Sequence, residues 1–87
     1  MKTFSLKIIT MDGIVLSDTA IEITLTTESG QISVFADHVA LLTIIKEGII
    51  TVKTEATLQK FKTSSGVLEI SPEHEVYILV DSATPTV

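Results

Sequence analysis

The sequence has 87 residues, a net charge of −5, and neither cysteine nor arginine. This length provides one hydrophobic core and leaves no room for a separate catalytic lobe. An acidic chain is repelled by phosphate backbones, so nucleic-acid binding is not expected. A chain without cysteine has no thiol chemistry, which excludes redox chemistry. No apolar run approaches the roughly 20 residues of a membrane helix, so direct membrane insertion is not expected.

Strands are predicted from the first residues onward. Apolar and polar side chains alternate over residues 4–8, which is the period of a strand with one buried face. An Asp-Gly pair at 12–13 then turns the chain into a short apolar strand at 14–16. Residues 21–26 form the clearest amphipathic strand, and the sequence at 28–30 supplies the next turn with a glycine that tolerates positive φ.

The second half of the chain continues the same pattern, with one ambiguous segment. Residues 39–45 are apolar apart from Thr43, so a helical turn and a fully buried strand both fit, and periodicity cannot separate them. Residues 82–87 have no periodicity and are expected to form a frayed tail. The remaining strands are predicted at 32–34, 49–54, 57–63, 67–70 and 76–80, of which the second and third form a hairpin.

Composition supports this interpretation. Threonine, isoleucine and valine account for 33 of the 87 residues, and their β-branched side chains fit a pleated sheet. Short strands with a turn signal about every 8 to 12 residues describe an all-β fold. We therefore predict one domain over residues 1–87, a flattened antiparallel β-sandwich or barrel of about ten short strands.

The residues that could carry chemistry form no catalytic or metal-binding pattern. His38 and His74 occupy separate predicted loops without a third ligand at metal spacing, so solvated loop histidines are the better interpretation. Ser64 and Ser65 lack the flanking pattern of a nucleophile elbow and are typical of a turn. We expect no catalytic residue, no metal and no cofactor.

Two functional alternatives remain at this point. A small hydrolase could use His38 and Asp37, but adjacent residues point apart and make a poor dyad. The other alternative is a free-standing sandwich that binds a ligand, a carbohydrate or another protein. To hold a sugar or a small molecule, it would need a concave aromatic patch. That patch is hard to build without tryptophan, so no small-molecule ligand is expected, and the available aromatic residues are Phe4, Phe35, Phe61 and Tyr77.

One stretch combines loops with apolar side chains. Phe35, Val39 and Leu42 follow the turn at 28–30 and are either core residues or exposed docking residues. Exposed apolar side chains beside loops are typical of a small domain that binds another protein. Protein binding is therefore the expected function.

Three segments in this region, residues 30–34, 38–42 and 46–49, resemble the epsilon subunit of F-type ATP synthase in residue type and spacing. Residues 6–13 look like the opening strand and Asp-Gly turn of that family, and the resemblance covers essentially the whole chain without a gap. The departures affect turns and no buried face. Ala40 and Met11 replace common prolines, and Ser33 and Ser65 replace common glycines.

The resemblance implies a non-catalytic subunit of the central stalk, or rotor, of the F1 sector. Such a domain is a flattened barrel of about ten strands that docks on the gamma subunit and the c-ring and couples ion-driven rotation to ATP synthesis. It would lie peripherally at the cytoplasmic face of a bacterial inner membrane. The residues expected to face the c-ring are Ser29, Gly30 and Gln31, and those expected to face gamma are Thr10, His38, Val39 and Leu42.

The family's C-terminal helical hairpin has no counterpart in these 87 residues. In the family, that hairpin carries inhibition of ATP hydrolysis and, in some members, ATP binding. Neither property is expected of these residues, which correspond to the docking domain.

Overall fold

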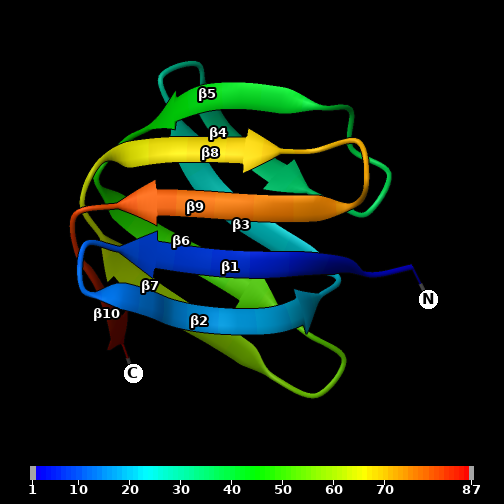
Figure 1. Cartoon of the computed structure of the whole chain (residues 1–87), viewed down its shortest axis with the longest axis horizontal. Helices are drawn as coiled ribbons and strands as arrows, with labels where there is room; N and C mark the ends of the chain where they lie inside the picture. Colours follow the sequence, from blue (N-terminus) through cyan, green and yellow to red (C-terminus); the bar gives the residue numbers. More distant parts are fainter. Residues whose placement is uncertain (1, 87) are drawn as a thin grey trace.

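The computed structural model describes residues 2–86, which form ten strands and no helix (Figure 1). Within this range there is no helix of the length and apolar character that crossing a membrane requires. The strands are β1 (Phe4–Thr10), β2 (Gly13–Ala20), β3 (Glu22–Thr27), β4 (Gly30–Val34), β5 (Leu41–Ile45), β6 (Gly48–Lys53), β7 (Leu58–Thr63), β8 (Gly66–Ile70), β9 (Glu75–Val80) and β10 (Ala83–Thr86).

The strands form two layers that face each other. The front layer contains β5, β8, β9, β1 and β2 in that order, and the back layer contains β4, β3, β6, β7 and β10 (Figure 1). β3 also pairs with β5 where Thr27 lies opposite Ile45, so one continuous sheet turns from the back layer into the front layer. All pairs are antiparallel except β1 with β9, which are parallel. The predicted all-β sandwich is confirmed, with this one parallel pair as an addition.

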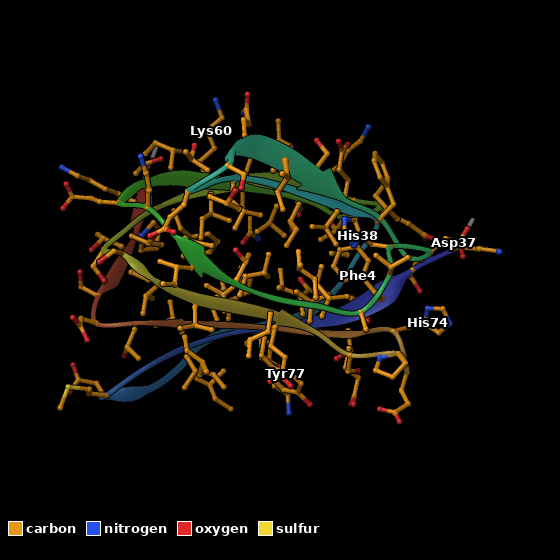
Figure 2. The ribbon with its side chains drawn as sticks, turned by 90° about the horizontal axis from the view of Figure 1, so that it is seen from above. Phe4, Asp37, His38, Lys60, His74 and Tyr77 are labelled. Carbon is orange, nitrogen blue, oxygen red and sulfur yellow. The ribbon has the colours of Figure 1, made fainter. Side chains whose placement is uncertain are left out.

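The core lies between the layers, where the inward side chains of both meet (Figure 2). Fully burying one such aliphatic or aromatic side chain contributes about 1.5 to 3 kcal/mol. The largest buried apolar residues of the front layer are Phe4, Leu6, Ile8, Ile45, Leu68, Ile70, Val76, Ile78 and Val80, and those of the back layer are Ile23, Leu25, Val34, Ile50, Val52 and Phe61.

The ambiguous segment at 39–45 corresponds to neither predicted form. It contains the strand β5, which begins at Leu41, and its side chains alternate between buried and exposed positions. Ile45 is buried, whereas Leu42 is 71% exposed and Ile44 is 52% exposed. β5 is therefore an ordinary strand of the front layer with an apolar outer face.

The expectation of a frayed tail is wrong for most of residues 82–87. Ala83–Thr86 forms β10, which pairs with β7 and places Pro85 opposite Phe61. Proline cannot donate a backbone hydrogen bond, and an edge strand such as β10 tolerates it. Val87 lies outside the described residues. The strand predicted at 14–16 is also longer than expected, since β2 extends from Gly13 to Ala20.

Two threonines are buried in the core and differ in their hydrogen bonding. The Thr27 hydroxyl donates to the Gly30 carbonyl over 3.0 Å and accepts from the Ser29 amide over 3.1 Å. The Thr63 hydroxyl is buried and has no hydrogen-bond partner among residues 2–86. Burying an unpaired hydroxyl destabilises the fold, whereas removing a paired hydroxyl destabilises it through the loss of its hydrogen bonds.

We therefore expect Thr63→Val to raise the free energy of unfolding by about 1 kcal/mol, because valine has the same shape and no polar atom to satisfy. Thr27→Val is the matched control and should lower the same quantity by about 1 to 2 kcal/mol through the loss of two hydrogen bonds. Urea denaturation of both variants measures the difference. A destabilised Thr63→Val would show that its hydroxyl is satisfied in solution.

Candidate docking surfaces

An apolar row crosses the outer face of the front layer. The register of the four strand pairs places one outward apolar residue of each strand directly opposite the next. Side chains paired in this way lie about 4.5 to 5.5 Å apart at Cβ. We call this set the outer apolar row, and its members from β5 to β2 are Ile44, Val67, Leu79, Ile9 and Ile14.

The outer apolar row is accessible to a partner. Ile44 is 52% exposed, Leu79 is 43% exposed and Ile14 is 58% exposed, while Val67 and Ile9 are half-buried. A β-bulge in the β1–β2 pair leaves Val15 as an extra residue beside the row. A contiguous apolar surface of this kind on a small domain marks an interaction site more often than scattered apolar residues do.

Two hollows open on the front layer. A hollow of about 460 Å³ lies beside Leu79 and is lined by Thr10, Met11 and Gly66 among others. A second hollow of about 370 Å³ lies beside Leu42 and Glu69, near the start of β5. Both are open depressions that an apolar side chain of a partner can enter.

Sequence patterns did not identify the outer apolar row, although a signal for it existed. Ile78, Leu79 and Val80 are consecutive apolar residues in a strand whose outward position should be polar. Ile8 with Ile9 and Ile44 with Ile45 break the alternation in the same way. Each break marks an outward apolar residue, but only the register reveals that these residues form one row.

The four residues expected to face gamma are not grouped together, and His38 and Val39 precede β5 at the end farther from the row. Leu42 is 71% exposed and Val39 is 74% exposed, at the start of β5 and in the loop before it. Thr10 ends β1 at the opposite side of the sheet, where its hydroxyl accepts from the Asp12 amide over 3.2 Å. β1 is three strands from β5, or about 14 Å. One partner surface must span the front layer to reach all of them.

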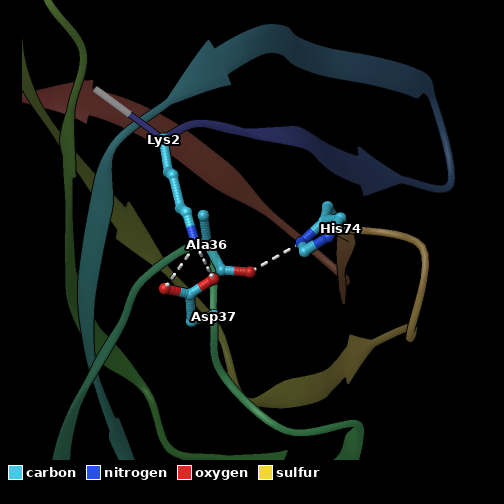
Figure 3. A network of polar contacts seen from close by, with 4 residues as sticks. All are labelled: Lys2, Ala36, Asp37 and His74. Carbon is cyan, nitrogen blue, oxygen red and sulfur yellow. Dashed lines mark hydrogen bonds and ion pairs between the residues drawn. The ribbon is translucent and has the colours of Figure 1, made fainter.

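The β4–β5 loop, residues 35–40, is fixed by contacts at its base. The Lys2 ammonium and the Asp37 carboxylate form an ion pair of 3.2 Å, and the His74 ring donates from Nδ1 to the Ala36 carbonyl over 2.7 Å (Figure 3). Ala36 is buried, whereas Phe35 is 53% exposed. The loop is therefore anchored on its inner side and presents apolar side chains outward.

Ser29, Gly30 and Gln31 lie together at the tip of the β3–β4 hairpin and are all exposed. Gly30 has a φ of 116°, which only glycine adopts readily. The base of the hairpin is joined to the end of β5, where the Lys46 amide donates to the Thr26 carbonyl over 2.9 Å. The three residues expected to face the c-ring thus form a separate surface beside the front layer (Figure 1).

The catalytic and ligand-binding alternatives gain no support from the arrangement of side chains. His38 donates from Nδ1 to the Val39 carbonyl over 2.8 Å, and Asp37 pairs with Lys2, so these adjacent residues have separate partners. Phe4 and Phe61 are buried in the core and cannot contribute to an aromatic platform. Among residues 2–86, no three acidic, histidine or cysteine side chains lie close enough to hold a metal ion.

Three acidic side chains lie on one side of the outer apolar row, with Glu69 next to the row and Glu73 and Glu75 farther from it. Glu69 lies opposite both Leu42 and Tyr77, and Glu75 lies two residues before Tyr77 on the same face. The negative charge of Glu75 is the largest cause that raises the pKa of Tyr77, and Glu69 and Glu73 raise it further. We call Glu69, Glu73 and Glu75 the acidic margin.

The fold and the front layer define a β-sandwich domain with an apolar row across one outer face, an arrangement typical of domains that bind other proteins. The family model of the ATP synthase delta/epsilon chain, beta-sandwich domain, matches residues 3–86. The chain belongs to this family.

Several curated relatives support the assignment. The chain is 40% identical over 85 residues to the ATP synthase epsilon chain of Clostridium novyi, 37% identical over 81 residues to that of Gloeothece citriformis, and 32% identical over 83 residues to that of Desulfitobacterium hafniense. These matches cover 94%, 93% and 95% of the present chain. The chain spans only 63%, 58% and 62% of the length of these relatives.

Solved structures share the fold at lower identity. A chain in the Euglena gracilis mitochondrial ATP synthase, in an assembly of OSCP, F1 and c-ring, matches with a TM-score of 0.90 and 24% identity over 95% of this chain and 53% of its own length. A chain of the central stalk and c-ring of the Tetrahymena thermophila mitochondrial ATP synthase matches with a TM-score of 0.81 and 14% identity over 94% of this chain and 66% of its own length. At these identities the matches show the fold.

Proposed function

We propose that this chain is a non-catalytic docking domain of the central stalk of an ATP synthase, which binds the gamma subunit through the outer apolar row. The observation that carries the proposal is that row, in which one outward residue from each of five adjacent strands is apolar and lies opposite the next. The membership of the family and the central-stalk assemblies of the structural neighbours support it.

The second contact in this proposal is the β3–β4 hairpin, whose exposed tip meets the polar loops of the c-ring. Ser29 and Gln31 offer hydroxyl and amide groups there, and Gly30 lets the backbone approach closely. A domain held on two sides, by an apolar face and by a polar tip, transmits torque between its partners because neither contact slides. It lies peripherally at the cytoplasmic face of a bacterial inner membrane.

Co-elution tests the proposal. The purified chain is mixed at micromolar concentration with gamma subunit, with c-ring, and with both, and each mixture is separated by gel filtration. The expected result is a complex with gamma alone and a larger assembly when both partners are present. If the chain elutes with neither partner, the proposed function is wrong.

A further inference from the structure

Charge is unevenly distributed between the two layers. The strands of the back layer carry three lysines and one acid, namely Lys53, Lys60, Lys62 and Glu22. The strands of the front layer carry three acids and one lysine, namely Asp18, Glu69, Glu75 and Lys7. The outer apolar row therefore lies on the acidic side of the molecule.

Glu69 cannot stay outside an interface that covers the outer apolar row. It lies two residues from Val67 on the same face of β8, about 7 Å away, and directly opposite Leu42 and Tyr77. A partner that packs on Val67 and Leu79 removes water from the Glu69 carboxylate as well. Within residues 2–86, the single ion pair joins Lys2 to Asp37, so the acidic margin has no cation of its own within pairing distance.

We propose that the partner of this face carries lysine or arginine at the edge of its apolar contact, placed against Glu69 and Glu75. A carboxylate that loses water without gaining a counter-charge destabilises a complex, whereas a matched cation offsets the loss. The inference rests on the proposed function, because it specifies the chemistry of the surface that meets the outer apolar row. A second copy of this chain is disfavoured, since its own front layer is acidic.

Salt titration with charge reversal tests the inference. Binding of the purified gamma subunit is measured from about 50 mM to about 500 mM NaCl, a range over which exposed charges become screened. We expect the dissociation constant of the unchanged chain to rise about tenfold or more over this range. At low salt, Glu69→Lys should weaken binding by about tenfold and flatten the salt dependence, and the neutral Glu69→Gln should have a smaller effect in the same direction.

Glu55→Lys is the matched control. It makes the same change of net charge at an exposed residue of the β6–β7 turn, which belongs to the back layer. This variant should bind gamma within about twofold of the unchanged chain and keep its salt dependence, because a distant exposed charge is screened.

The outcomes separate this inference from the function on which it rests. The inference of a basic partner surface is wrong if the dissociation constant does not change with NaCl concentration, or if Glu69→Lys binds gamma like Glu55→Lys. Either result leaves the proposed function intact. Absence of any binding by the unchanged chain overturns both. A dimer of the chain alone in sedimentation equilibrium, dissociated by Leu79→Gln, would place a second copy on this face and would also overturn the inference.

Discussion

Gly66→Ala is expected to lower the free energy of unfolding by about 3 kcal/mol, since a side chain at this position has no space. A Cβ atom on Gly66 would collide with the carbonyl oxygen of Leu79 and lie 2.8 Å from Cγ1 of Val80. The first obstacle is backbone of the paired strand β9, so β8 and β9 must separate locally to admit a methyl group. For a domain of this size, the loss corresponds to a fall in Tm of roughly 12 to 24 °C.

Gly48→Ala is the matched control for this prediction. Gly48 also opens a strand, but apart from its two chain neighbours no residue of the described range 2–86 has an atom within 4 Å of the place that its Cβ would occupy, and its φ is not positive. Its substitution should change the free energy of unfolding by less than about 1 kcal/mol, with stabilisation favoured through the unfolded state. Thermal and urea denaturation measure both variants. Equal stability of the two would show that the close approach at Gly66 relaxes without cost.

The sequence predicts the strands well because their signals are local. The amphipathic strand at 21–26 and the hairpin of β6 and β7 are both encoded by residues close together in the sequence. The structure contains both. β10 gave no such signal, because an edge strand of four residues with Pro85 is stabilised mainly by its pairing with β7. That pairing is invisible in the local pattern.

The docking surface was harder to predict because it depends on contacts between residues that are distant in the sequence. Ile9 meets Leu79 only through the parallel pairing of β1 with β9. Exposure of Phe35, Val39 and Leu42 was one of two possibilities that the sequence left open, and the structure confirms it for all three. Recognising the outer apolar row required the register of four strand pairs, which residue types alone do not specify.

Leu79→Gln is expected to weaken binding of the gamma subunit by about 30-fold, which corresponds to about 2 kcal/mol for a central interface residue. Leu79 lies in the middle of the outer apolar row, between Val67 and Ile9. Glutamine is similar in length and uncharged, so the variant removes apolar contact without altering the charge of the front layer. Because Leu79 is 43% exposed, the fold should remain intact, which circular dichroism verifies.

The most direct test of docking through the outer apolar row is a calorimetric titration of the gamma subunit with three chains, namely the unchanged chain, Leu79→Gln and Leu58→Gln. Leu58 is 62% exposed on β7 in the back layer and provides the same substitution away from the row. We expect Leu58→Gln to bind like the unchanged chain and Leu79→Gln to bind about 30-fold more weakly. Equal affinities for all three chains, or a loss confined to Leu58→Gln, would contradict docking through this row.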